Sequence, residues 1–184
     1  PDVNKVSFTG STAVGKKVMK SCADRVTNCL LELGGKSATI ILEDADLDIA
    51  VPGAIFGTFF HTGQVCESGT RILVPDALHD TFIERLKVEM ENVVVGDPMD
   101  MDTTVGPMIS ERQRANTERY VQSLRDDGAT LVFGGKRPPH CDPDGYYYEP
   151  TCFTDVSNDM TGACEEIFGP VVVVIRYGDE DEAI

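Results

Sequence analysis

Residues 29–42 read Cys-Leu-Leu-Glu-Leu-Gly-Gly-Lys-Ser-Ala-Thr-Ile-Ile-Leu, two short apolar runs on either side of a glycine pair. The runs 29–33 and 38–42 have the length and composition of β-strands, and the glycines interrupt the extended chain between them. Acidic residues follow the second run, and Asp46 is placed to cap a helix over about 47–60. This succession of strands and a helix favours an α/β fold.

The alternation continues upstream. Residues 3–8 are a predicted strand that runs into a turn at 9–12. Val14, Val18 and Cys22 then recur every four residues, which predicts a helix with these side chains on a buried stripe.

It also continues downstream. A helix begins at Asp76, and Ser110 followed by Gln113 has the form of a capping box that starts another helix. The remaining predicted elements are strands at 72–74, 131–133, 149–153 and 171–177 and a surface loop over 134–145.

Charge and hydropathy exclude several classes of partner. The chain has 31 acidic and 16 basic residues and a net charge of −15, so we expect no binding to nucleic acid. The longest aliphatic run, 171–175, is far shorter than the ~20 residues of a membrane-spanning helix. The first residues show no basic stretch followed by an apolar run, so we expect no signal peptide. We therefore expect no membrane association and a cytoplasmic location.

The spacing of the cysteines argues against a metal centre. No pair reads Cys-x-x-Cys, and the three histidines complete no zinc pattern. Scattered cysteines without a secretory signal are typical of reduced thiols in a cytoplasmic protein. They are Cys22, Cys29, Cys66, Cys141, Cys152 and Cys164.

The turn Gly10-Ser-Thr-Ala-Val-Gly15 lies between a predicted strand and a helix, where free backbone N–H groups can bind an anion such as phosphate. With Lys16 it also reads G-x-x-x-x-G-K, close to a P-loop. A P-loop needs Ser or Thr after its lysine, and Lys17 stands there instead. A capped turn without a ligand is the plain alternative.

Glu32 is set among leucines at the end of a predicted strand. Burial of such a carboxyl would raise its pKa toward the range of a general base. Period-two alternation equally places Glu32 opposite Leu31 and Leu33, on a solvated face. Both interpretations stay open.

Cys66 lies between glycines, after a predicted helix and before a predicted strand. Backbone N–H groups are exposed at such a place and can stabilise an oxyanion beside a nucleophilic sulfur. A buried inert thiol is the alternative, although such cysteines usually sit within apolar runs. His61 as the base of a cysteine hydrolase is a minor interpretation, because its spacing puts it on another helix face.

The segment Glu165-Glu-Ile-Phe-Gly-Pro170 places two acids and an aromatic ring before a strand. Such carboxylates can accept hydrogen bonds from ribose hydroxyls, and the ring can pack on a planar cofactor. The alternative is a solvated acidic pair ahead of a core phenylalanine.

Taken together and in order, these segments resemble the aldehyde dehydrogenase superfamily. The matching motifs are Phe-Thr-Gly-Ser-Thr at 8–12, Leu-Glu-Leu-Gly-Gly-Lys at 31–36, Gly-Gln-Val-Cys with Gly-Thr-Arg at 63–71, Val-Gly-Asp-Pro at 95–98, Gly-Pro-Met at 106–108 and Glu-Ile-Phe-Gly-Pro at 166–170. His61 departs from the family, which commonly has asparagine five residues before the nucleophile.

The resemblance implies that Cys66 attacks an aldehyde, that hydride leaves to NAD or NADP, and that Glu32 activates the water that hydrolyses the thioester. Glu166 would hold the nicotinamide ribose and Phe168 would pack near the ring. For Gln113, a place near the adenosine and a capping-box role explain the residue equally well. The residues implied to bind cofactor are Gly10, Ser11, Leu33, Gly34, Gln113, Glu166 and Phe168.

The resemblance further implies that residues 1–34 end a Rossmann-like cofactor domain and that 35–184 are most of an α/β catalytic domain. The asparagine of the oxyanion hole, and the residues that choose between NAD and NADP, would lie outside this chain. We therefore expect residues 1–184 alone to be inactive and the full-length protein to be a homodimer or homotetramer. A P-loop-like nucleotide-binding protein and a non-catalytic structural relative are the alternative functions.

Overall fold

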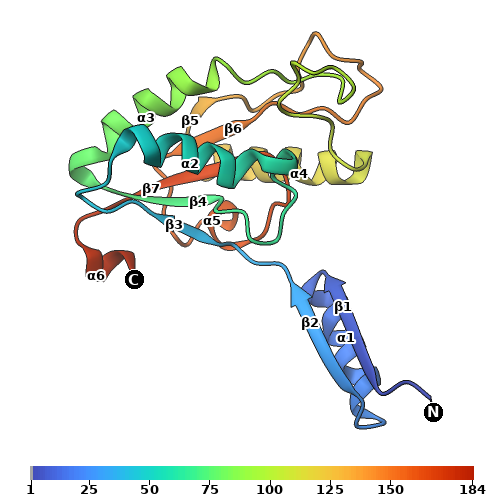
Figure 1. Cartoon of the computed structure of the whole chain (residues 1–184). Coiled ribbons are helices and arrows are strands. Elements are labelled where there is room, and N and C mark those ends of the chain that lie inside the picture. The colour runs from blue at the N-terminus through green and yellow to red at the C-terminus, as the bar shows by residue number, and fades with distance from the viewer. Residues whose placement is uncertain (1) are drawn as a thin grey trace. The chain divides into compact units, whose positions relative to one another are not determined.

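The computed structural model describes residues 2–184, whose contacts separate two units, Pro1–Gly35 and Lys36–Ile184. Each unit has its own sheet and its own helix or helices (Figure 1). The α/β fold expected from the sequence is therefore present in both.

The smaller unit is a strand–helix–strand segment. β1 (Lys5–Gly10) and β2 (Asn28–Leu33) pair in parallel, and α1 (Thr12–Ala23) connects them. Gly15 allows α1 to pack closely on β2, because a Cβ at Gly15 would lie 2.6 Å from Cδ2 of Leu33.

Two details of this unit differ from the prediction. β1 includes Thr9 and Gly10, which the sequence assigned to a turn, because they pair with the end of β2. The predicted buried stripe of α1 is wrong at Val14, which is 42% exposed, whereas Cys22 is buried.

The larger unit is built on a five-stranded sheet of order β3-β4-β7-β6-β5. β5 runs antiparallel to β6, and all other neighbours are parallel. The strands are β3 (Ala38–Ile40), β4 (Arg71–Pro75), β5 (Thr130–Phe133), β6 (Thr151–Thr154) and β7 (Val171–Tyr177).

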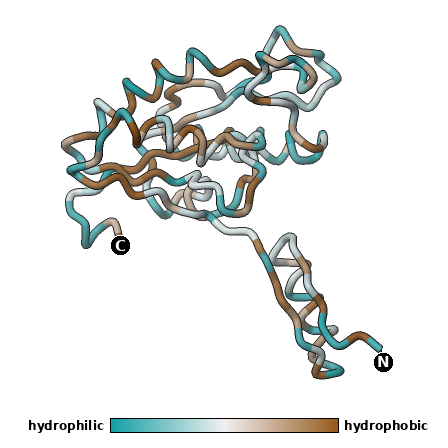
Figure 2. Tube along the Cα trace, viewed as in Figure 1, coloured by the Kyte–Doolittle hydropathy of each residue, from teal (hydrophilic) through white to brown (hydrophobic). Residues whose placement is uncertain are grey.

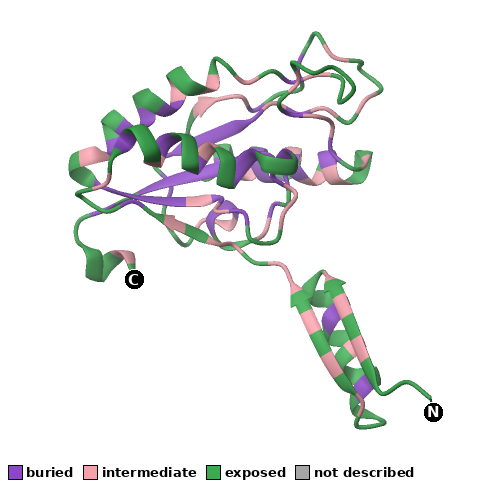
Figure 3. Ribbon diagram, viewed as in Figure 1, coloured by how far each residue is buried: buried purple, intermediate pink, exposed green. Residues whose placement is uncertain are grey.

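Helices cover both faces of this sheet. α2 (Leu47–Phe59) and α3 (Asp76–Met90) pack on one face, with Val172 and Val174 of β7. α4 (Glu111–Asp126) packs on the other face, with side chains that include Val171 and Val173. Because both faces are covered, the central strand is a continuous hydrophobic run and is buried along most of its length (Figures 2 and 3).

Side-chain caps fix the starts of two helices as the sequence predicts. Asp46 Oδ1 accepts from the backbone N–H of Asp48 at 2.9 Å, and Ser110 Oγ accepts from that of Gln113 at 3.2 Å.

The short elements are the 3₁₀-helix η1 (Phe60–Gly63), α5 (Thr161–Cys164) and α6 (Glu180–Ala183).

Within residues 2–184, no helix is both long and apolar enough to span a bilayer. The same residues contain no cluster of three side chains able to hold a metal ion.

Candidate active site

The chain turns sharply between α2 and the segment that carries Cys66. His61, Thr62 and Gly63 have φ angles of 50°, 60° and 67°, all in the left-handed region that ordinary L-residues disfavour. Thr62 is held there by its hydroxyl, which donates to the Gly106 carbonyl at 3.2 Å. The exposed His61 ring packs edge-on against Phe60, with centroids 4.1 Å apart, which gives no support to a cysteine–histidine pair.

Cys66 is exposed at the corner of a tight turn. The turn is closed by the Ser68 N–H, which donates to the Val65 carbonyl at 3.2 Å. Among the hydrogen bonds of residues 2–184, none uses the Cys66 N–H as donor. The sulfur and an available N–H thus lie on one residue, which is the arrangement that nucleophilic attack with oxyanion stabilisation requires.

The side chain of Gln64 holds the loop that carries Cys66 through two hydrogen bonds, a role that the sequence analysis missed. Its Oε1 accepts from the Ile109 N–H at 3.0 Å, and its Nε2 donates to the His61 carbonyl at 3.4 Å. Gly106 of the Gly-Pro-Met motif therefore supports the Cys66 loop through Thr62, and Ile109, directly after the motif, supports it through Gln64.

The segment 165–170 packs directly beside the loop 61–66, which leads to Cys66. A Cβ added at Gly63 would lie 2.2 Å from the Gly169 carbonyl oxygen, so the two backbones are in close contact. Ile167 is buried, whereas Phe168 is 37% exposed and has a φ of 55°. The alternative of a core phenylalanine is therefore wrong, because the left-handed backbone turns the Phe168 ring out and leaves Ile167 in the core.

A hollow of about 820 Å³ opens between these loops. Phe168 and His61 lie on its wall, and Thr62 and Gln64 contribute polar atoms. Its lining is completed by Phe60, Pro98, Thr103, Thr104, Gly106, Pro107 and Ile109.

Glu166 is half-buried and lies in the field of Lys36. The Lys36 ammonium is buried without a hydrogen-bond partner among the described residues. Burial, reinforced by the charge of Arg71, lowers the pKa of Lys36 to about 7, against the smaller opposing effects of Cys164 and Glu166. The Gly-Gly-Lys sequence carries no signal of this burial, since lysine is usually exposed.

The structure thus brings the Cys66 loop, Glu166 and Phe168 together within the larger unit. Gln113 contacts the same segment as Glu166 and Phe168, because its Nε2 donates to the carbonyls of Ile167 and Phe168 at 2.9 and 2.8 Å.

The other predicted site residues lie at the ends of the strands and at the start of α1 in the smaller unit. Ser11 is the N-cap of α1 and accepts from the Val14 N–H at 3.4 Å. Glu32 is exposed on β2, with Leu31 and Leu33 on the opposite, half-buried side, so the solvated-face interpretation describes this chain. Gly10 and Leu33 end the two strands as paired residues, and Gly34 follows directly.

Fold and site together define an α/β protein with an exposed thiol on a loop that packs against the segment carrying a half-buried acid. The chain belongs to the aldehyde dehydrogenase family, whose sequence profile matches residues 1–184. The resemblance found in the motifs is therefore confirmed.

Curated relatives and solved structures agree with this assignment. The chain is 49% identical to a betaine aldehyde dehydrogenase of Rhizobium johnstonii, over 100% of the chain and 38% of that protein. A variant of an aldehyde dehydrogenase from Bacillus cereus superposes with a TM-score of 0.95 at 43% identity, over 100% of this chain and 37% of that one. A betaine aldehyde dehydrogenase of Staphylococcus aureus, solved with NAD+, gives a TM-score of 0.94 at 44% identity, over 98% and 36%.

The chain thus spans a little over a third of the length of the proteins that it matches.

Proposed function

We propose that the full-length protein oxidises an aldehyde to a carboxylic acid, with Cys66 as the nucleophile and a nicotinamide dinucleotide as the oxidant. The observation that carries this proposal is the exposed Cys66 on a turn whose own N–H is available, in a loop packed against the turn of Glu166 and Phe168. Membership of the family supports the same chemistry.

The thiolate of Cys66 attacks the aldehyde carbon, and the new C–S bond gives a tetrahedral oxyanion that the Cys66 N–H stabilises. A bound nicotinamide dinucleotide would supply the acceptor for the hydride that leaves this carbon. The carbon is thereby oxidised to a thioester on Cys66. Glu32 takes a proton from water, the hydroxide attacks the thioester, and the carboxylic acid leaves as the Cys66 thiolate is restored.

The residues present fit a dinucleotide. Glu166 offers a half-buried carboxylate for ribose hydroxyls, and the exposed Phe168 ring lies on the wall of the hollow. In the smaller unit, the start of α1 after Gly10 and Ser11 offers backbone N–H groups to phosphate, with Leu33 and Gly34 at the end of β2. Gln113 completes the set, through the carbonyls that it holds.

We infer NAD+ as the cofactor and betaine aldehyde as a substrate. Solved structures with 44% identity hold NAD+, and curated relatives with 45–49% identity are betaine aldehyde dehydrogenases. The alternatives of a P-loop protein and a non-catalytic relative are not supported, because the relatives are dehydrogenases and Lys17 occupies the P-loop Ser/Thr position.

The roles of the two parts of the chain follow from this function. Residues 1–34 would end the cofactor domain, and residues 35–184 would form most of the catalytic domain. A cytoplasmic location is supported by six free cysteines, which a reducing compartment maintains.

We also propose that the full-length protein is a homodimer or homotetramer. α2 is apolar except for Asp48 and Thr58, yet Ile49 and Phe56 on it are 72% and 66% exposed in this chain. A second copy of the subunit is the occupant that we assign to this face. Light scattering after size exclusion should give two or four subunits for the wild type and fewer for Phe56→Asp. A monomeric wild type would reject the assignment.

The function is tested on the full-length protein with betaine aldehyde and NAD+. Cys66→Ser should abolish reduction of NAD+, whereas Cys141→Ser, in a surface loop, should retain it. Peptide mass spectrometry of the wild type, quenched during turnover and digested, should show an acyl adduct on the Cys66 peptide. Normal turnover by Cys66→Ser, or an adduct on another cysteine, would reject the proposal.

A further inference from the structure

We propose that Gln113 is a positioning residue, whose side-chain amide holds the turn 166–169 in the conformation that presents Glu166 and Phe168. It acts on the nicotinamide half of the cofactor through this turn and makes no essential contact with the adenosine half. This inference rests on the proposed function and deepens it, since it names the residue that holds the turn 166–169 of the cofactor site in its conformation.

The amide nitrogen of Gln113 donates to two successive carbonyls. The distances are 2.9 Å to the Ile167 oxygen and 2.8 Å to the Phe168 oxygen. A primary amide has two N–H bonds, and these two contacts use both. The Gln113 nitrogen is therefore committed to this turn, and only its Oε1 remains to accept from a ribose hydroxyl.

The turn needs such a partner because of its backbone. Phe168 has a φ of 55°, a left-handed conformation that persists in a bulky residue only when the surroundings impose it. Its ring is exposed, so packing of the side chain does not impose the conformation. Hydrogen bonds to the carbonyls on either side of the Phe168 N–Cα bond fix the peptide planes that this torsion relates.

The same face of α4 holds the segment at further points. Asn116, Thr117 and Tyr120 follow Gln113 at helical spacings of three, four and seven residues, so all four side chains lie on one face. Asn116 Nδ2 donates to the Ile167 carbonyl at 3.3 Å, and Tyr120 Oη donates to Glu165 Oε2 at 2.6 Å. Thr117 packs against Gly169, since a Cβ added at Gly169 would lie 2.4 Å from Thr117 Oγ1.

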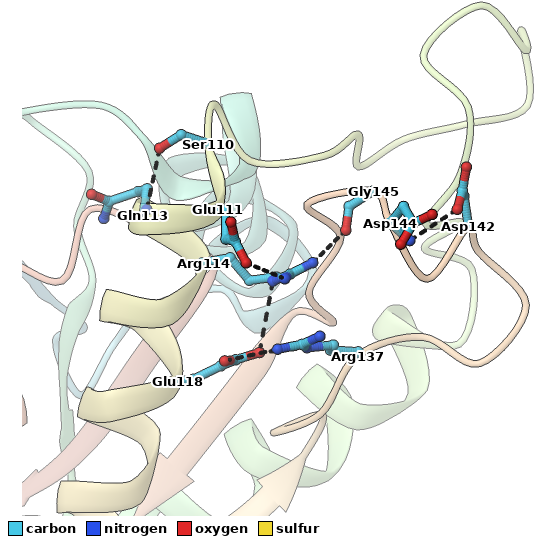
Figure 4. Close-up of polar contacts among 9 residues, drawn as sticks. All are labelled: Ser110, Glu111, Gln113, Arg114, Glu118, Arg137, Asp142, Asp144 and Gly145. Carbon is cyan, nitrogen blue, oxygen red and sulfur yellow. Dashed lines mark hydrogen bonds and ion pairs between the residues drawn. The ribbon is translucent and has the colours of Figure 1, made fainter.

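The start of α4, from which Gln113 projects, is itself anchored (Figure 4). Ser110 caps the backbone of Gln113, so the capping interaction and the amide contacts use different atoms of one residue. The neighbouring Arg114 is buried, donates to the Gly145 carbonyl, and lies 3.9 Å from both Glu111 and Glu118. The helix end is therefore a rigid support for the turn.

The test uses the full-length protein and compares Gln113→Ala with Gln122→Ala. Gln122 is a matched control, since it is an exposed glutamine on the same helix whose amide donates to Asp126 at 2.8 Å. The dissociation constants of NAD+ and of ADP are measured by titration calorimetry. Amide hydrogen exchange of residues 165–169 is measured without cofactor.

For Gln113→Ala we expect the dissociation constant of NAD+ to rise about tenfold, as two lost hydrogen bonds imply, and that of ADP to stay within about twofold. Exchange in 165–169 should be faster than in the wild type. Gln113→Glu, which keeps the shape of the side chain but loses both donors, should act in the same direction. Gln122→Ala should change none of these quantities.

Equal weakening of NAD+ and ADP binding would overturn the inference, because it would indicate direct contact with the adenosine half. Unchanged exchange in 165–169 for both Gln113 variants would overturn it too. Because amide exchange is measured without cofactor, it tests the inference even if a variant no longer binds NAD+ or ADP. Failure of the proposed function is distinguishable, because it would appear in the wild type as absence of NAD+ binding.

Discussion

Cys66 differs from the other five cysteines in the surroundings of its sulfur. It is exposed on a polar loop, whereas Cys22 and Cys152 are buried, and burial raises the pKa of the Cys152 thiol. Cys164 is also exposed, but its sulfur is engaged by the Asn158 carbonyl at 2.8 Å.

We therefore predict that iodoacetamide alkylates Cys66 of the full-length protein roughly tenfold or more faster than any other cysteine, because reactivity requires a sulfur that the reagent can reach. Peptide mass spectrometry over a time course measures the six rates. Comparable labelling of Cys66 and Cys164 would remove the basis for choosing Cys66 as the nucleophile.

Lys36 gives a prediction about pH. Its pKa in the folded chain is lowered from 10.5 to about 7, chiefly by burial. Between these two values the unfolded state binds more protons than the folded state, so the contribution of Lys36 to stability rises with pH from about 7 toward 10.5. Below about 7 the full cost of burying the charge is present.

Lys36→Met removes this titration while keeping a long side chain. We expect the variant to be more stable than the wild type near pH 7 and the difference to shrink as the pH approaches 10. Thermal midpoints of both full-length proteins across this range provide the measurement. A difference that is constant with pH would show that Lys36 is protonated throughout and that its burial has been misjudged.

At the scale of elements, the close contact between the loop 61–66 and the 165–170 segment depends on Gly63. This residue has a φ of 67°, and a Cβ would lie 2.2 Å from the Gly169 oxygen. Gly106 lies in a neighbouring loop and leaves room, since its nearest atom would be 3.8 Å from a Cβ.

We predict that Gly63→Ala destabilises the full-length protein by about 3 kcal/mol, from left-handed strain and overpacking together. Gly106→Ala should cost about 0.5 kcal/mol or less, as expected of a substitution that creates no clash. Chemical denaturation compares the two variants. Similar costs for both would mean that the two loops do not touch as described.

The elements that the sequence predicts best are those with a local cause. The strand at 171–177 is a β-branched run, and the helices after Asp46 and Ser110 begin at residues whose own side chains cap them. The end of β1 was misplaced, since Thr9 and Gly10 have turn propensity and extend only because they pair with β2. Pairing between distant segments is invisible to local propensity.

The same limit applies to the site. Motif order indicates Cys66, Glu166 and Phe168, and the larger unit brings them together. Local composition did not reveal that Ile167, and not Phe168, enters the core, because the outcome depends on a left-handed backbone. Nor did it reveal that the Gln113 amide reaches carbonyls 54 and 55 residues away.

At the scale of the whole molecule, the proposed reaction needs both units of the chain. Glu32 belongs to the smaller unit and Cys66 to the larger one. In the proposed mechanism each would serve a different step: Cys66 would form the covalent adduct from which hydride leaves, and Glu32 would act only when water attacks the thioester. Loss of activity alone does not separate these roles, but the order of product formation does.

The most direct measurement is therefore stopped-flow absorbance of reduced cofactor in full-length Glu32→Gln. The account predicts a burst of about one equivalent per active site, followed by a steady state slower by about 10²–10⁴-fold, because hydride transfer survives while general-base catalysis of hydrolysis is lost. Cys66→Ala should give no burst. Loss of the burst in Glu32→Gln while NAD+ still binds, or unchanged turnover in that variant, would contradict the account.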